Sequence, residues 1–174
     1  MKSALLLLFL IITQIAIAQN DHETFTAHEN LIGGIWKLDA KWGDGTPHKL
    51  NISYESSLDG LILKTTTHGN VKTDGYEFGL RNEGIRYFNK ETKTIEFYEF
   101  DVFGGLTKGS ITYNSKDIYY TYNYEVGGQK TEITDGWEYI NENTYKYSIG
   151  IYDFESNTWK QKFLNAEIKR LKSE

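Results

Sequence analysis

Residues 31–40 read LIGGIWKLDA, and this stretch decides the fold because it opens the first strand-like run of the chain. From Trp36 onward, apolar and polar residues alternate one by one. Successive side chains of a β-strand point to opposite faces of the sheet, so a strand with one buried face follows this period of two. We therefore expect two faces, with Trp36, Leu38 and Ala40 inward and Lys37, Asp39 and Lys41 outward.

The chain continues as short runs of strand length, separated by Gly, Asn and Asp at turn positions. Aromatic residues make up 15% of the chain, with 13 tyrosines and a single proline, which is typical of β structure. Alternation is clear in several runs, each of which puts one set of residues on one face: Leu50, Ile52 and Tyr54; Tyr76, Phe78 and Leu80; and Ile118, Tyr120, Tyr122 and Tyr124.

About ten such runs with short connections predict an all-β fold, an up-and-down antiparallel barrel. Closing the sheet removes the exposed strand edges. A two-sheet sandwich has the same pattern and remains the alternative. In a barrel, Gly34 lets the first strand approach its neighbours closely, and Trp36 can fill the narrow end.

The first 18 residues form a leader with Lys2, a short apolar run and the small residues of an A-x-A cleavage site at Ala16 to Ala18. The apolar run is short for a membrane span, and the chain has no cysteine that could carry a lipid. We expect cleavage after Ala18 and export to the periplasm or the medium, without a membrane anchor. A polar segment, 19–30, then precedes a single barrel domain, 31–174.

Net charge argues against nucleic acid as a partner. Removal of the leader takes away one lysine and no acidic residue, so the formal net charge changes from −5 to −6. An acidic chain with scattered lysines lacks the basic surface that phosphate backbones require.

The four histidines lack the spacing of a metal site: His22, His28, His48 and His68. The chain has no cysteine, which excludes thiolate ligands. No G-x-S-x-G motif is present. Glu99 and Asp101 share a strand face, which suits an acid/base pair, but we interpret them as a solvated outer face. We therefore expect no catalytic residue, no metal and no cofactor.

Aromatic side chains are the candidates for lining a cavity, and the alternative is that they fill a small barrel. Seven qualify: Tyr98, Tyr120, Tyr122, Tyr124, Trp137, Tyr145 and Tyr147. Within this set the candidate ligand-binding residues are Tyr98, Tyr120, Tyr122, Trp137 and Tyr147. The inward face of 94–103 stays open, because Ile95 and Phe97 compete with Tyr98 and Phe100.

Gly34-Ile35-Trp36 resembles the G-x-W signature that opens the lipocalin and wider calycin barrels. In those families an arginine on the last strand lies against this tryptophan, and Arg170 stands near the end of the last run. The resemblance implies a lipocalin-like barrel with the guanidinium of Arg170 over the indole of Trp36.

Residues 29–171 also resemble a bacterial domain-of-unknown-function family, number 1579, whose members are lipocalin-like proteins of unassigned activity. The likeness rests on short motifs in order: Ile85-Arg86-Tyr87-Phe88-Asn89, Thr92-Lys93-Thr94, Phe97-Tyr98-Glu99-Phe100-Asp101, Gly104-Gly105, Gly109, Tyr145-Lys146-Tyr147, Asn157-Thr158-Trp159-Lys160 and Ile168-Lys169-Arg170. A related ten-stranded family, the nitrobindins, holds haem through a late histidine. No histidine follows His68 here, which disfavours haem.

These observations predict a secreted, non-enzymatic barrel that binds a small apolar or amphipathic molecule. Two alternatives stay open. One is an enzyme that uses a polar cluster inside the barrel. The other is a protein-interaction module with a filled barrel.

Overall fold

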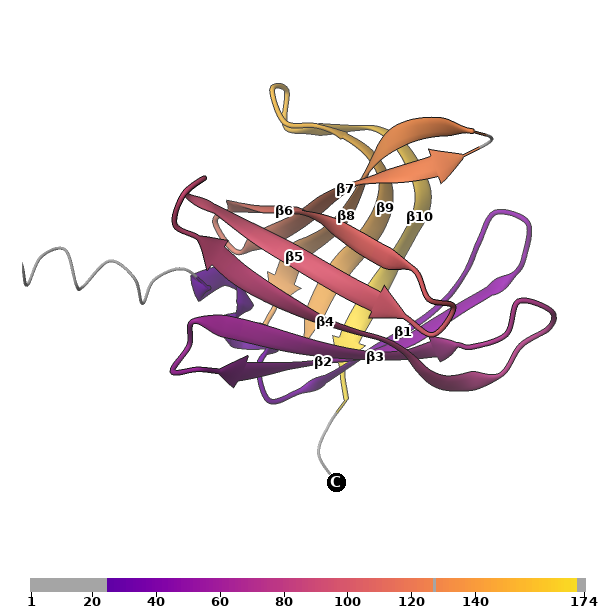
Figure 1. Ribbon diagram of the computed structural model, residues 1–174. Helices are drawn as coiled ribbons and strands as arrows, with labels where there is room; N and C mark the ends of the chain where they lie inside the picture. Colours follow the sequence, from indigo (N-terminus) through magenta and orange to yellow (C-terminus); the bar gives the residue numbers. More distant parts are fainter. Residues whose placement is uncertain (1–24, 127, 172–174) are drawn as a thin grey trace, which may run out of the picture.

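The computed structural model describes residues 25–126 and 128–171, and the expected leader lies outside these ranges. Ten antiparallel strands form a closed barrel in which each strand pairs with its chain neighbours and β1 pairs with β10 (Figure 1). The prediction of an up-and-down barrel is confirmed, and the sandwich is excluded. The strands are β1 (Ile35–Lys41), β2 (Pro47–Ser57), β3 (Ile62–Asn70), β4 (Phe78–Asn89), β5 (Thr94–Asp101), β6 (Leu106–Asn114), β7 (Asp117–Val126), β8 (Gln129–Asn141), β9 (Thr144–Asp153) and β10 (Thr158–Arg170).

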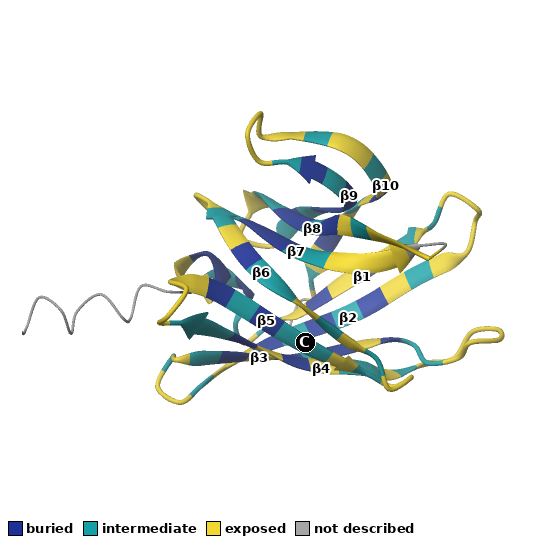
Figure 2. Ribbon diagram, turned by 45° about the horizontal axis from the view of Figure 1, so that its top comes forward, coloured by how far each residue is buried: buried dark blue, intermediate teal, exposed yellow. Residues whose placement is uncertain are grey.

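Burial alternates along most strands, as dark and light bands show in Figure 2. In β1 the alternation runs as expected, with Trp36 and Leu38 fully buried and Lys37 and Asp39 exposed. Inward side chains of all ten strands meet in one core because the sheet closes on itself.

A short 3-10 helix, η2 (Thr26–Leu31), covers the end of the barrel at which β1 begins; we call it the closed end. Its Ala27, His28 and Leu31 are buried in the barrel core, together with Phe25 just before it. The opposite end, which we call the open end, carries the loops that follow β1, β3 and β5. Among the described residues, no helix has the length and hydropathy of a bilayer span.

Trp36 and Arg170 meet at the closed end, where β1 and β10 pair with these two residues opposite each other. The guanidinium carbon lies 4.9 Å from the centre of the indole ring, and Arg170 also donates a hydrogen bond to the carbonyl of Asn30. The indole N–H of Trp36 donates to the carbonyl of Leu31 at 3.1 Å. A Cβ at Gly34 would come within 2.9 Å of the Arg170 guanidinium, so glycine leaves the space for this stacking.

A second aromatic cluster lies on the outer face of the barrel, beside the β9–β10 hairpin. Tyr119 stacks on Tyr152 with ring centres 4.5 Å apart, and Trp159 lies 5.0 Å from Tyr152. Two register shifts in the β9–β10 pairing accompany the bend of this hairpin away from the barrel in Figure 1. This cluster explains why Tyr119 and Tyr152 are buried although they point outward.

Candidate functional site

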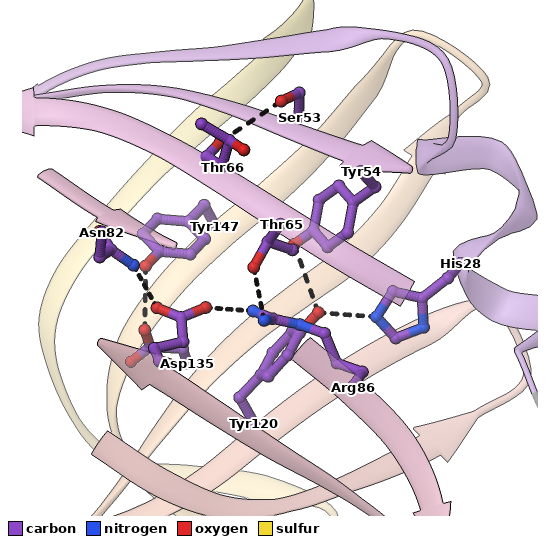
Figure 3. Close-up of polar contacts among 11 residues, drawn as sticks. His28, Ser53, Tyr54, Thr65, Thr66, Asn82, Arg86, Tyr120, Asp135 and Tyr147 are labelled. Carbon is purple, nitrogen blue, oxygen red and sulfur yellow. Dashed lines mark hydrogen bonds and ion pairs between the residues drawn. The ribbon is translucent and has the colours of Figure 1, made fainter. Parts of the chain in front are cut away.

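Polar and charged side chains cross the interior of the barrel above the closed end (Figure 3). All but His28, which lies in η2, occupy inward positions in their strands, so the closed topology brings together residues far apart in the sequence. The set contains His28, Thr65, Asn82, Arg86, Glu99, Tyr120, Tyr122, Asp135 and Tyr147. We call these residues the interior polar layer.

Arg86 is the buried cation of this layer, with 3% of its surface exposed. Its guanidinium pairs with the Glu99 carboxylate and donates to the hydroxyl of Thr65 at 2.6 Å. Asn82 donates to the other oxygen of Glu99. Burial alone would lower the pKa of Arg86, but the neighbouring Glu99 carboxylate raises it above its ordinary value. A Cβ at Gly84 would lie 2.9 Å from this guanidinium, so glycine leaves room for the ion pair.

Aromatic rings surround the Arg86 guanidinium. Its central carbon lies 5.2 Å from the ring centre of Tyr120 and 5.8 Å from those of Tyr54 and Phe97. A ring face attracts a cation, and the attraction grows as water is removed. The protein therefore holds its own cation between one carboxylate and three aromatic rings.

Asp135 on β8 supplies the second carboxylate of the layer. The hydroxyls of Tyr122 and Tyr147 donate to its two oxygens at 3.0 and 3.1 Å. Among the described residues, no ion pair joins Asp135 to a basic side chain. Burial raises the pKa of Asp135 to about 7, and the negative charge of Glu99 adds to the rise, while the two tyrosine hydrogen bonds oppose it. Asp135 thus changes charge near neutral pH.

Burial differs among the members of this layer. Asp135 is intermediate in exposure as a residue, and 23% of the Glu99 side chain is exposed, although both residues point into the barrel. Arg86, one inward position closer to the closed end than Glu99, is buried, and so is Tyr120, which lies opposite Asp135 in the register of β7 and β8.

His28 is the member of the layer that lies in η2, and it is fully buried. Its Nδ1 lies 2.5 Å from the hydroxyl of Tyr113 and its Nε2 lies 2.6 Å from that of Tyr120. Burial lowers the pKa of His28 well below its ordinary value, and the positive charge of Arg86 lowers it further. The neutral ring can donate through one nitrogen and accept through the other, which satisfies both bonds.

Four of the five predicted ligand-binding residues come together in the interior: Tyr120, Tyr122, Trp137 and Tyr147. Trp137 packs edge-on against Tyr147, with ring centres 5.6 Å apart. The placement of Tyr98 is wrong, because Ile95 and Phe97 take the inward positions of β5 and the period of two turns Tyr98 outward, beside Tyr87 and Glu96.

The interpretation of Glu99 and Asp101 as a solvated outer face is also wrong. Both lie on the inward face set by Ile95 and Phe97. Glu99 pairs with Arg86, whereas Asp101 accepts hydrogen bonds from the backbone N–H groups of the following loop, at Phe103 and Gly105. The two carboxylates therefore have separate partners and do not form an acid/base pair.

Sequence reasoning missed Arg86, Asp135 and His28. For Asp135 a signal exists, because it stands between Ile133 and Trp137 at the spacing of an inward face. A charged residue at a core position is a candidate for function.

An apolar hollow of about 500 Å³ lies at the rim of the closed end. It is lined by Phe25 before η2, by the β2–β3 turn and the start of β3, and by the second half of β4 and the residue after it. These residues are Phe25, Leu58, Gly60, Leu61, Ile62, Ile85, Tyr87, Phe88 and Lys90. Its lining is suited to a wholly apolar molecule rather than to one with a charged head.

Within residues 25–126 and 128–171, no group of three or more His, Asp or Glu side chains is arranged to hold a metal ion. No protein-family model matches this chain, and no curated protein matches it in sequence.

Proposed function

We propose that the protein is an exported, lipocalin-like barrel that binds a small amphipathic molecule through its open end, without acting on it chemically. The observation that carries this proposal is Asp135, a carboxylate that points into the barrel and whose described partners are tyrosine hydroxyls. Small-molecule sites combine apolar walls with a few convergent polar groups, and this layer has that composition. We also propose that the protein is a member of the bacterial domain-of-unknown-function family 1579, which its sequence resembles.

The head of the ligand would lie on Asp135, and its apolar part would point toward the open end. Ile133 and Ile149 are buried apolar residues that lie one inward position nearer the open end than Asp135 and Tyr147, on β8 and β9. Binding rather than catalysis is favoured because His28 and Glu99 are already engaged by tyrosines and by Arg86. In the enzyme alternative, Asp135 would be the acid or base, but its bonds within the described interior give it no neighbouring nucleophile other than two tyrosines.

The test is native mass spectrometry of the protein purified from its own host, compared with a blocked variant. Thr67→Phe adds a ring on the inward face of β3, beside Asn82 in the register, and Thr66→Phe places the same ring on the outward face. We expect a bound small molecule on the wild-type protein and on Thr66→Phe, and its loss from Thr67→Phe. Equal occupancy of all three proteins would refute binding inside the barrel, and circular dichroism checks that both variants are folded.

The apolar hollow supports a second candidate, the binding of a wholly apolar molecule at the closed end. Leu61 is 51% exposed at the rim of this hollow, so Leu61→Glu adds a charge there without disturbing the core. Loss of the bound molecule from Leu61→Glu, but not from Thr67→Phe, would assign binding to the hollow instead of the barrel interior.

A further inference from the structure

We infer that the polar head of the ligand is a primary ammonium group that pairs with Asp135 between Tyr122 and Tyr147. This inference rests on the proposed function, because it names the class of molecule that the same site binds. It follows from the charges of the layer, from the surroundings of Asp135 and from the hydrogen-bond donors and acceptors there.

The charges of the interior polar layer leave one negative charge without a counterion. Arg86 and Glu99 neutralise each other in an ion pair. Asp135 receives hydrogen bonds from two hydroxyls and repulsion from Glu99. Nearer the open end, Arg81 donates to the backbone carbonyl of Asn70, the last residue of β3, and Asp101 accepts from the β5–β6 loop, so one positive and one negative side chain are each held by backbone groups there. A ligand with one positive charge balances the layer, whereas an anion would face two carboxylates.

The surroundings of Asp135 share some features with those of Arg86. The Glu99 carboxylate and the ring faces of Tyr120 and Phe97 surround the guanidinium of Arg86. At Asp135, Tyr122 and Tyr147 present their hydroxyls to the carboxylate. A carboxylate attracts a cation, and the described residues pair none with Asp135.

Hydrogen-bond capacity selects a primary ammonium. This group has three N–H donors and no acceptor, so its partners must accept. The carboxylate oxygens of Asp135 accept, and the hydroxyls of Tyr122 and Tyr147 retain acceptor capacity while they donate to Asp135. Burial raises the pKa of both tyrosines, which keeps the hydroxyls neutral.

Isothermal titration calorimetry at pH 8 with three probes of equal chain length tests the inference: octylamine, 1-octanol and octanoate. We expect octylamine to bind about tenfold or more tightly than 1-octanol, with octanoate weakest. If 1-octanol or octanoate equals octylamine, the inference is wrong while the proposed function stands. If none of the three binds, the proposed function fails with it.

Two variants distinguish an effect of the Asp135 charge on binding from an effect on folding. Asp135→Asn keeps the shape and removes the charge, and we expect it to weaken octylamine about tenfold while 1-octanol changes by less than about twofold. The control is Glu132→Gln, three residues away on the exposed outer face of β8, which should leave all three affinities unchanged. Equal losses for octylamine and 1-octanol in Asp135→Asn, or unchanged octylamine binding, would overturn the inference. Circular dichroism shows that both variants are folded.

Discussion

The closed end of the barrel and the surroundings of Asp135 both place polar or charged groups among aromatic residues, but they differ in how far those groups have partners within the protein. At the closed end, Arg170 lies over Trp36 and donates to the carbonyl of Asn30, and His28 has a hydroxyl on each ring nitrogen. Nearer the open end, Asp135 accepts hydrogen bonds from two tyrosines, pairs with no basic side chain among the described residues, and is only intermediate in burial. The difference separates residues that hold the fold from residues that are available to a ligand.

Trp36→Ala should break the closed end with the largest effect. Trp36 is fully buried and packs against Trp137 and Tyr145, so its loss leaves a large cavity. We expect a loss of about 3–5 kcal/mol in the free energy of unfolding, measured by chemical denaturation. Trp159→Ala, on the outer cluster, is the control with a smaller loss. Similar losses for both would contradict the special place of the closed end.

Glu99→Gln should come next, because it leaves the buried charge of Arg86 without its counterion. We expect a loss of about 3 kcal/mol in the free energy of unfolding. The double variant Glu99→Gln, Arg86→Met removes both charges and should recover part of that loss. A double variant less stable than Glu99→Gln alone would show that the ion pair is not what Arg86 requires.

The pH dependence of stability should separate His28 from Asp135 because their pKa values shift in opposite senses on folding. The pKa of His28 falls below its unfolded value of 6.5, so the folded protein refuses a proton that the unfolded chain accepts, and stability is lost as the pH falls below about 6.5. The pKa of Asp135 rises from 3.8 to about 7, so stability is gained as the pH falls from 7 toward 4.

Each of these groups contributes up to about 1.4 kcal/mol per pH unit, and in the wild-type protein the two contributions oppose each other between pH 5 and pH 6.5. Urea denaturation from pH 7 to pH 5 should therefore show opposite deviations in two variants. Stability should fall more steeply with falling pH in Asp135→Asn than in wild type, and less steeply in His28→Gln. Parallel curves for all three proteins would refute the assignment.

Arg170→Ala should have the smallest effect of the series. It removes the stacking on Trp36 and the bond to Asn30, but it leaves the indole buried. We expect a loss of about 1–2 kcal/mol in the free energy of unfolding, and Arg170→Lys should restore only part because an ammonium lacks the planar face. Full recovery in Arg170→Lys would mean that charge alone matters there.

Much of the fold could be predicted from sequence because alternation and turn residues are local signals. The run from Trp36 to Lys41 fixes which face of β1 is buried, and the barrel then requires its pairing with the strand that carries Arg170. The approach of Trp36 to Arg170 follows from closure of the barrel, so the G-x-W pattern at the start of β1 together with an arginine near the end of the last strand could predict it.

The interior polar layer was harder to predict from the sequence because its residues are far apart in the chain. Around Arg86 both faces carry apolar residues, since Ile85 and Tyr87 alternate with Arg86 and Phe88, so a period of two does not decide which side is inward. Ile85 is 38% exposed in the structure. His28 stands in a polar stretch and becomes buried only because η2 closes the barrel.

Titration of Asp135 by NMR, followed at its carboxyl carbon in isotopically labelled protein, shows whether this carboxylate is the ligand's partner. We expect a pKa of about 7 in the free protein, which falls when octylamine is added because the ammonium stabilises the ionised carboxylate. A pKa near the ordinary value of about 4, or one that octylamine leaves unchanged, would contradict this expectation.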